Sequence, residues 1–349
     1  MARTTSGRRP TVKDVAASAG VSATTVSRVL GGTYPVSAST RNRVLRAVRD
    51  LDYVINAQAR ALVGGSTRTV AFIVRDLVGP LFAYIGQGVE LQATAEGRVC
   101  LVCTHHGDPD RELELIELMR QQGAEAVVLV GGGLRTEAHV RRMAEIAHSL
   151  DRAGSRLVLC GRPPIGADVP ATVVEYDNEG GAFAVTDYLI SLGHRRIAFV
   201  GAGEREHTTT GARLNGFLDA HATRGLEVDQ ELVVSGNYDR ESGYRQTKML
   251  LDRRAGMTAV VAVTDVVASG VLAALRDAGV RVPEDVSVVG YDDIPLSGDL
   301  DLTTVHLPHE ELGRAAVRLA LHRDEYALDQ HLKLGTHVVI RSSTAKRES

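Results

Sequence analysis

Apolar and polar positions alternate with a helical period at the start of the chain. Thr11 and Asp14 have the spacing of a helix capping box, and Gly20 suits the left-handed conformation that ends a helix. The apolar positions between them repeat at i, i+3, i+4 and i+7, as one buried helix face requires. They are Val12, Val15, Ala16 and Ala19. The pattern predicts a short helix that ends at a tight turn.

Two further helices are predicted after this turn. Ser22 is a good N-cap for the second helix. Its apolar face consists of Val26, Val29 and Leu30. A third helical pattern runs from about 38 to 51. Its inward positions are Val44, Val48 and Leu51. Two short helices joined by a glycine turn are typical of a helix-turn-helix, whose second helix enters the major groove of DNA.

The exposed positions of the second helix carry short side chains and one arginine. They are Ala23, Thr24, Thr25, Ser27 and Arg28. Short side chains allow close approach to base edges, and Arg28 can offer the bidentate fork that proteins most often use on guanine. The alternative is that these hydroxyls merely cap and solvate a surface helix, and the two-helix pattern alone does not separate the two interpretations.

Beyond a flexible joint at 64–67, continuous apolar runs alternate with helical stretches. The predicted strands are 70–74, 99–103, 126–130, 156–159, 172–175, 196–200, 259–263 and 286–290. Helical patterns fill most of the gaps, for example 82–95, 111–121, 181–192, 212–222, 243–251 and 268–278. This alternation is typical of parallel sheets covered on both faces. About 270 residues is too many for one such sheet, so we expect two α/β lobes with a ligand at the carboxyl ends of their strands.

Composition excludes several classes of protein. The chain has 349 residues, of which 44% are hydrophobic and 24% charged, as in ordinary globular proteins. No apolar run reaches the roughly 18 residues of a membrane span, and the basic start MARTTSGRRP lacks the apolar core of a secretory signal. Three cysteines cannot build a disulfide framework. We therefore expect a cytoplasmic protein with no membrane partner.

The net charge of −3 is unevenly divided along the chain. Residues 1–64 contain ten basic and three acidic side chains, a charge of +7, which leaves −10 on the remainder. A basic module joined to an acidic body indicates a nucleic-acid-binding protein. A solvated basic tail would have the same charge, but the helical periodicity argues against it.

Two runs in the basic module are more specific than its periodicity: TVKDVAASAGVSATTVSRVL and VSASTRNRVLRAVRDLDYVINAQARAL. They resemble the DNA-binding headpiece of the lactose-repressor (LacI/GalR) family. The resemblance implies a hinge helix from Asn56 to Val63, in which Leu62 wedges into the minor groove and the small Ala59 allows close approach. Ile55 departs from relatives, which often carry proline there. The DNA-contacting residues implied are Thr11, Ser22, Ala23, Thr24, Thr25, Ser27, Arg28, Asn56, Ala59 and Leu62.

The resemblance continues through the acidic body. Its signatures are GPLF at 79–82, YDNEGG at 176–181, LGHRRIAF at 192–199, RLNGF at 213–217, VPEDVSVVGYDD at 282–293 and LTTV at 302–305. The fold implied is an all-α helix-turn-helix headpiece with a hinge helix, followed by a two-lobed α/β effector domain like the type I periplasmic binding proteins. In that fold the chain crosses between the lobes three times. The expected domains are the headpiece at 1–55, the hinge and linker at 56–68, and the effector-binding and dimerisation domain at 69–349.

An effector between two lobes needs fixed hydrogen-bonding groups and an apolar stacking surface. By motif position, the resemblance implies Arg213 as a bidentate donor, Asp292 as an acceptor and Tyr238 as the stacking aromatic. Thr264 stands where relatives usually carry asparagine, which weakens the transfer of that contact to this chain. The full implied set is Asp76, Leu81, Phe82, Arg162, His207, Thr209, Arg213, Tyr238, Asp265 and Asp292. The alternative for the charged members is a structural ion pair, and Tyr238 could equally be a surface aromatic.

Other motifs complete no catalytic or metal site. Cys100 and Cys103 have C-x-x-C spacing but lie in an apolar strand without a second pair. His306 and His309 fall at a lobe crossing, where a solvated or capping role is expected. The glycine turns at 131–133 and 201–203 do not complete G-x-G-x-x-G, which makes an NAD-dependent enzyme a weak alternative. A periplasmic solute-binding protein is the other alternative, opposed by the fused headpiece and the missing signal. No cofactor is expected.

The sequence therefore predicts a ligand-responsive transcriptional regulator, a repressor that binds a pseudo-palindromic double-stranded operator as a homodimer. Sugars are the family's commonest effectors, and purines and nucleosides also occur; the residues do not choose between them or between induction and co-repression. Effector binding is expected to change lobe closure and the spacing of the two hinges. The chain ends at Ser349 without a heptad helix, so we expect no tetramer-forming tail.

Overall fold

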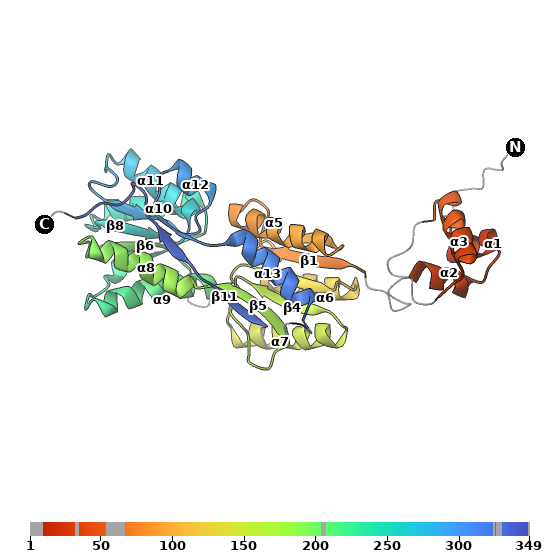
Figure 1. Cartoon of the computed structure of the whole chain (residues 1–349). Coiled ribbons are helices and arrows are strands. Elements are labelled where there is room, and N and C mark those ends of the chain that lie inside the picture. The colour runs from red at the N-terminus through yellow and green to blue at the C-terminus, as the bar shows by residue number, and fades with distance from the viewer. Residues whose placement is uncertain are drawn as a thin grey trace.

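The computed structural model describes residues 10–31, 35–53, 67–203, 207–323, 325 and 330–347. It shows a small helical unit followed by a larger body of two α/β lobes (Figure 1). The predicted hinge helix at 56–63, with Asn56, Ala59 and Leu62, lies outside the described residues. No helix within the described ranges is long and apolar enough to cross a membrane.

The headpiece contains the three predicted helices. They are α1 (Val12–Ala19), α2 (Ala23–Gly31) and α3 (Ala38–Asp50). The capping box forms, because the Thr11 amide donates to Asp14 Oδ2 at 2.7 Å, and Gly20 ends α1 with φ of 63°. Val15, Val26 and Val44, one from each helix, are fully buried together. The apolar stripes read from the sequence thus form a single small core.

Lobe 1 is a parallel sheet with helices on both faces. Its elements are β1 (Thr69–Val74), α5 (Pro80–Ala95), β2 (Val99–Thr104), α6 (Pro109–Gln121), β3 (Ala126–Val130), α7 (Glu137–Arg152), β4 (Arg156–Cys160), β5 (Ala171–Tyr176), α13 (His309–Leu321) and β11 (His331–Leu334). The strand order is β11-β5-β4-β3-β1-β2. Val70 and Phe72 of β1 face α5 and α13, whereas Ala71 and Ile73 face α6 and α7. Both faces of β1 are buried, which explains its continuous apolar run.

Lobe 2 has the same layered plan around a smaller sheet. Its elements are α8 (Asn178–Ser191), β6 (Ile197–Ala202), α9 (Thr208–Thr223), the 3₁₀ turn Gln230–Leu232, β7 (Val233–Ser235), α10 (Arg240–Asp252), β8 (Ala259–Ala262), α11 (Asp265–Asp277), β9 (Ser287–Val289) and α12 (Pro295–Asp299). The strand order is β7-β6-β8-β9, all parallel. Gly243 and Gly270 let α10 and α11 touch, since a Cβ on either would overlap the other helix's backbone.

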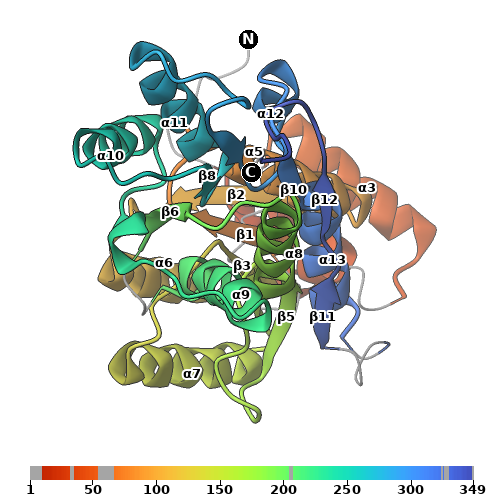
Figure 2. The same ribbon diagram turned by 90° about the vertical axis from the view of Figure 1, so that its left-hand side faces the viewer.

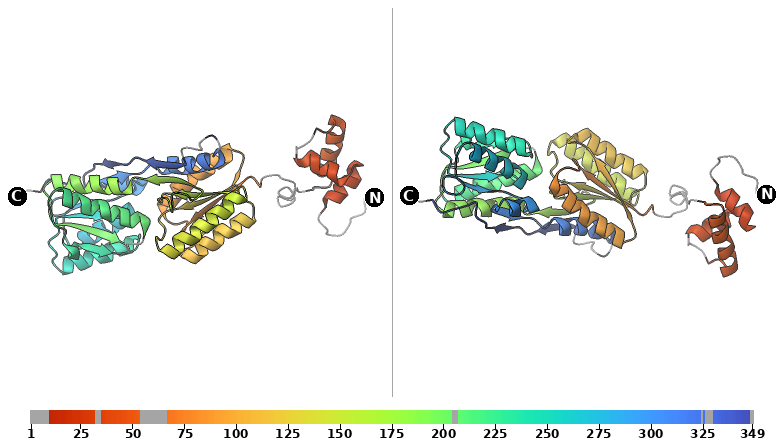
Figure 3. Two further views of the ribbon diagram at one scale, coloured as in Figure 1. Left: turned by 90° about the horizontal axis from the view of Figure 1, so that it is seen from below. Right: turned by 90° about the horizontal axis from the view of Figure 1, so that it is seen from above.

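Three described segments connect the lobes along one side of the body (Figures 2 and 3). The first joins β5 to α8, the second joins β10 (Thr304–His306) to α13, and the third joins β11 to β12 (His337–Val339). Strands β10 and β12 pair antiparallel next to lobe 2. Helix α13 and strand β11 therefore complete lobe 1, although they are far in sequence from its other elements, which end at Tyr176 (Figure 1).

Each of the eight predicted strands is present, with its ends shifted by two residues at most. Among the described residues, β7, β10, β11 and β12 were not predicted. They are three or four residues long, and β11 and β12 are largely exposed or half-exposed, so they carry no continuous apolar run. Short strands at an edge or a crossing depend on their partners more than on their own residues.

Candidate functional site

The two lobes touch where the loops after β3 and β6 meet. The Gly133 amide donates to Thr208 Oγ1 at 3.0 Å, and the Thr208 amide donates to the Gly133 carbonyl at 3.1 Å. Leu134 and His207 form an isolated antiparallel bridge beside them. A Cβ on Gly132 would lie 2.8 Å from His207 Nδ1 and 3.0 Å from Thr209 Oγ1. Only a glycine backbone can approach so closely, and the lobes are held in contact across the carboxyl ends of their strands.

Arg213 lies on the lobe 2 side of this region, on α9, with 3% of its surface exposed. Its Nε donates to Asn178 Oδ1 at 3.0 Å, and its Nη1 donates to the Val263 carbonyl at 2.6 Å. Its Nη2 donates to Asp292 Oδ1 at 3.0 Å. The guanidinium carbon also lies 3.8 Å from the centre of the Tyr291 ring. The structure thus brings Arg213 and Asp292 together as an ion pair, which the sequence analysis gave as the alternative to their role as effector contacts.

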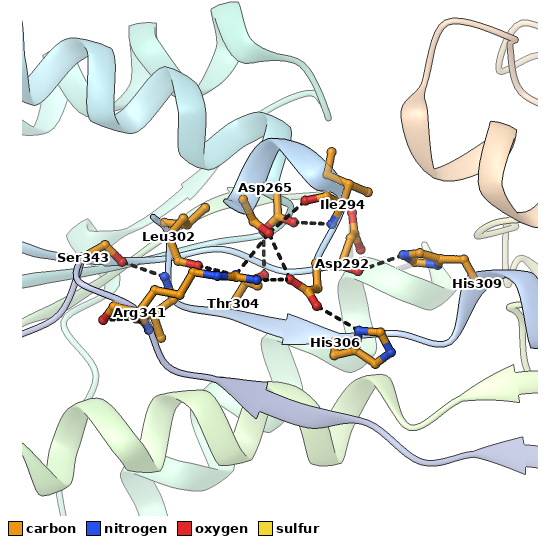
Figure 4. Close-up of polar contacts among 12 residues, drawn as sticks. Asp265, Asp292, Ile294, Leu302, Thr304, His306, His309, Arg341 and Ser343 are labelled. Atoms are coloured by element: carbon orange, nitrogen blue, oxygen red, sulfur yellow. Dashed lines mark hydrogen bonds and ion pairs between the residues drawn. The ribbon is translucent and has the colours of Figure 1, made fainter. Parts of the chain in front are cut away.

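Asp292 follows β9 in an uncommon backbone conformation, with φ of 109°. Burial raises the pKa of its carboxyl to about 6, although the charge and hydrogen bond of Arg213 act in the opposite direction. Its amide donates to the Val305 carbonyl at 3.0 Å. Its carbonyl accepts from His309 Nε2 at 2.8 Å (Figure 4). Asp292 is thus tied by side chain and backbone at once.

Asp265 lies deeper in lobe 2 and has no exposed surface. It accepts hydrogen bonds from the Ile294 amide at 3.0 Å and from Thr304 Oγ1 at 2.6 Å (Figure 4). Burial, reinforced by the negative charge of Asp292, raises the pKa of Asp265 to about 8. These contacts need no ligand and hold the loop after β9 on the start of α11.

In lobe 1, Arg162 lies just after the end of β4. It forms a bidentate pair with Glu112, Nη1 to Oε1 at 3.1 Å and Nη2 to Oε2 at 3.0 Å. Its Nε donates to the Gly131 carbonyl at 2.8 Å. The ring nitrogens of His105 and His139 each lie 3.7 Å from a Glu112 oxygen. Burial raises the pKa of Glu112, but Arg162 outweighs it and lowers that pKa well below its usual range.

The remaining lobe 1 candidates lie at the start of α5. Asp76 accepts from the amides of Val78 at 3.0 Å and Gly79 at 2.8 Å, and so shapes the turn before the helix. The Phe82 ring lies against Gly131, where a Cβ would come within 3.1 Å of it. Leu81 and Phe82 are both half-buried. Phe82 thus bridges the loops after β1 and β3.

The lobe 2 loop residues form a separate polar group. Tyr238 and Thr210 share a hydrogen bond between their hydroxyls, and the Tyr238 and His207 rings lie 6.3 Å apart. Burial raises the pKa of Tyr238. Thr209 Oγ1 is buried without a hydrogen-bond partner. A buried hydroxyl without a partner is uncommon and is available to a ligand.

A cavity of about 130 Å³ adjoins the contact between the lobes. Its wall combines apolar and polar side chains, including Met143, Ile165, His139, Arg162 and Thr208. It is small, because the lobes are in contact beside it. Within the described ranges, no group of three or more histidine, cysteine or acidic side chains is arranged to hold a metal ion.

Comparison with known proteins identifies both parts of the chain. Residues 11–56 match a family model described as bacterial regulatory proteins, lacI family, and residues 186–344 match one described as a periplasmic binding protein-like domain. The HTH-type transcriptional regulator CelR of Thermobifida fusca is 37% identical over 345 residues, which cover 96% of this chain and 98% of CelR. The chain belongs to the LacI family. It is a DNA-binding transcriptional regulator with an effector domain.

Solved structures agree with this LacI-family assignment. The CelR–cellobiose complex covers 96% of this chain and all of its own, with a TM-score of 0.68 and 34% identity. The lac repressor dimer bound to operator and an anti-inducer covers 97% of this chain and all of its own, with a TM-score of 0.79. At 24% identity, the second likeness speaks for the fold alone.

The headpiece of this LacI-family chain presents the predicted residues on α2. Ser22, Ala23, Thr24 and Arg28 are exposed, and Thr25 and Ser27 are half-buried. Ser22 Oγ accepts from the Thr25 amide at 3.1 Å, which confirms it as the cap of α2. Thr11 is engaged in the capping box of α1.

Sequence reasoning missed several residues that surround and support the candidate site. Glu112 is the ion-pair partner of Arg162 from α6, Thr208 joins the lobes, and His309 is buried where a solvated or capping role was expected. Glu112 lies on a helix rich in acidic residues, and only its position on the buried face could have separated it from the others. Thr208 stands between two residues that were chosen, His207 and Thr209.

Proposed function

We propose that the chain represses transcription as a homodimer and that a small polar molecule of the sugar class binds between its lobes. The observation that carries the effector site is the buried Arg213–Asp292 pair of lobe 2, in which the Asp292 carbonyl accepts a hydrogen bond from His309 of the second lobe crossing. A guanidinium and a carboxylate side by side can donate to and accept from neighbouring hydroxyls of one ligand. Tyr238, Phe82 and the hydroxyl of Thr209 add a stacking surface and a further donor.

A ligand screen on the full chain tests the effector class. Cellobiose is the first probe because a relative has been solved with it, and a panel of pentoses, purines and nucleosides accompanies it. We expect a sugar to raise the melting temperature, since a ligand that binds only the folded state stabilises it. Stabilisation by purines or nucleosides alone would overturn the sugar assignment. Operator affinity with and without the stabilising ligand then gives the direction of the response.

The homodimer is supported by an uncovered strand edge in lobe 1. Strand β2 ends its sheet and pairs only with β1 among the described strands. Val99, Leu101 and Val102 on it are between 41% and 63% exposed. An apolar strand at a sheet edge is a site of association unless something covers it. We infer that a second copy of the chain covers it, which also sets two headpieces side by side for a pseudo-palindromic operator.

We infer further that the chain is no dinucleotide-dependent enzyme and acts in the cytoplasm, where its operator is. The two glycine turns that suggest an enzyme are filled by protein. Gly132 lies against His207 and Thr209, and Gly201 lies against the side chain of Val263. A phosphate-binding turn needs its backbone amides open to the ligand. Saturable binding of NAD by the full chain would contradict this inference.

A further inference from the structure

The second lobe crossing carries a buried histidine that is bonded on both sides of its ring. His309 begins α13 and is 8% exposed. Its Nε2 lies 2.8 Å from the Asp292 carbonyl oxygen, and its Nδ1 lies 2.8 Å from the Tyr176 hydroxyl. Figure 4 shows the ring reaching from the lobe 1 side toward the Asp292 backbone. No solvated role fits this position.

The direction of both hydrogen bonds follows from the chemistry of the partners. A backbone carbonyl can only accept, so His309 donates from Nε2 to Asp292. In the neutral ring Nδ1 is then the acceptor, and the Tyr176 hydroxyl donates to it. Burial lowers the pKa of His309 to about 4, which keeps the ring neutral and both bonds in this direction near pH 7.

The histidine ring touches segments from both lobes. On the lobe 1 side, Tyr176 ends β5, and the Tyr84 ring of α5 stacks on His309 with centroids 6.4 Å apart and planes 22° apart. Helix α5 also carries Leu81 and Phe82 in its first turn. On the lobe 2 side, the bonded residue is Asp292, whose carboxylate pairs with Arg213. One side chain thus connects the candidate effector segments of the two lobes.

We propose that His309 is a positioning residue that holds the Asp292 backbone and ties it to α5 and β5, so that effector binding at Asp292 is transmitted to lobe 1. A residue other than glycine persists at φ of 109° only when its surroundings hold it there, and the His309 bond is one of those restraints. The transmission step rests on the proposed function, because that function makes Asp292 an effector contact.

Hydrogen exchange on the ligand-free full chain tests the link without any effector. His309→Leu removes both bonds, whereas His309→Gln keeps a donor near the place of Nε2 and loses the ring stack and the Nδ1 acceptor. We expect Leu to speed exchange by about tenfold or more both at the loop 290–294 and at residues 80–85. Gln is expected to restore slow exchange at 290–294 only. A residue that merely fills space would give the same pattern in both variants.

His221→Leu is the matched control. His221 is also buried, its Nδ1 lies 2.9 Å from the Phe217 carbonyl, and its ring lies 4.5 Å from the Phe217 ring. It sits near the end of α9. The control should leave both exchange segments unchanged. Equal effects of His221→Leu and His309→Leu, or identical exchange in the Leu and Gln variants, would overturn the proposal.

The transmission step is measured with cellobiose as the probe. If wild type binds cellobiose and changes operator affinity by about tenfold, His309→Leu should keep its cellobiose affinity within a few-fold and lose most of that change. A full response in the variant would refute transmission. If wild type does not bind cellobiose, this probe contradicts the effector assignment. The hydrogen-exchange experiment still tests whether His309 links the Asp292 loop to α5.

Discussion

At the scale of single residues, the buried arginines Arg162 and Arg213 are tolerated because each has a carboxylate partner at hydrogen-bond distance. Arg213 and Arg162 each pair with one carboxylate and also donate to backbone carbonyls. Removing a charge from water costs several kcal/mol, which a partner at hydrogen-bond distance offsets. Breaking such a pair therefore costs more than the pair contributes by its presence.

Replacing Arg213 with methionine should lower the free energy of unfolding by about 3–5 kcal/mol, because Asp292 would remain buried without its partner. Urea denaturation at pH 7 measures this, and effector binding should be lost as well. Arg224→Met is the control, because its pair with Asp187 is exposed and should contribute at most about 1 kcal/mol. Equal losses of unfolding free energy in the two variants would show that burial does not make the Arg213–Asp292 pair more important for stability than an exposed pair.

The raised pKa of Asp265 predicts how the stability of the fold depends on pH. Its pKa is raised to about 8 in the folded chain from an ordinary value of 3.8, so the folded state holds the proton more tightly than the unfolded state. Its contribution to stability is therefore present at low pH and is lost as pH rises toward about 8. Asp265→Asn keeps the shape without this charge, so its melting temperature should rise relative to that of wild type from about pH 4 to about pH 8, and the difference should level off above pH 8. Parallel melting-temperature curves for wild type and Asp265→Asn would contradict this.

At the scale of elements, α2 is positioned by its ends and its single buried valine. Ser22 caps its start, and Val26 anchors it to α1 and α3 while the opposite face stays exposed. A short helix held at its N-terminus presents its first turns at a constant angle, which is what groove recognition requires. The turn at Gly20 sets its direction relative to α1.

Arg28→Ala on this helix should relax base preference at one operator position and weaken specific binding by about 1–3 kcal/mol. A half-site library selected with both proteins measures it. Substitution of Lys13 provides the comparison, because a phosphate contact would weaken binding uniformly over all sequences. Unchanged selectivity of the Arg28 variant would remove this residue from direct base recognition.

The proposed hinge element gives a separate prediction. Leu62→Ala should reduce operator bending and operator affinity, because an apolar wedge in the minor groove unstacks a base step. Effector binding should be unaffected, since Leu62 precedes the effector domain in the chain. Circularly permuted operator fragments report the bend angle, and equal bending by both proteins would refute the wedge role.

At the scale of the whole molecule, the described part of the chain joins the lobes by three crossings on one side, and the lobes touch at Gly133 and Thr208. Their contact can therefore change without unfolding either sheet, as a hinged closure requires. Residues 1–64 carry a charge of +7 and the remainder −10, so we expect DNA to be attracted by the headpiece and not by the acidic body. Together these features let one part bind the operator and another respond to a small molecule.

The strand edge of β2 yields the prediction at this scale. Val102→Lys places a charge on a side chain that is 50% exposed in the single chain, so folding should be retained while dimers dissociate. Sedimentation equilibrium should show monomers, and operator affinity should fall because each half-site is then bound alone. Ile340→Lys, at another exposed apolar residue, should stay dimeric. An unchanged dimer of the Val102 variant would place the interface elsewhere.

Most of the architecture was predictable because its signals are local. The stripe of Val15 and Ala19 and the cap at Ser22 act within one or two helical turns. The runs such as 126–130 are apolar because both faces of a parallel sheet are covered. Arg213 and Asp292 were both chosen through the family resemblance, as effector contacts, but their pairing with each other was not predicted, since 79 residues separate them.

By itself, then, the sequence determined the helices of the headpiece, eight strands of the two sheets and the division of charge, since these depend on neighbours along the chain. Tertiary structure alone decided which side chains meet where strand ends converge. It gave Arg162 its partner on α6, put Thr208 against Gly133, and enclosed His309 between Tyr176 and Asp292. Such contacts depend on strand order and lobe closure, which bring distant segments together, and no local pattern records them.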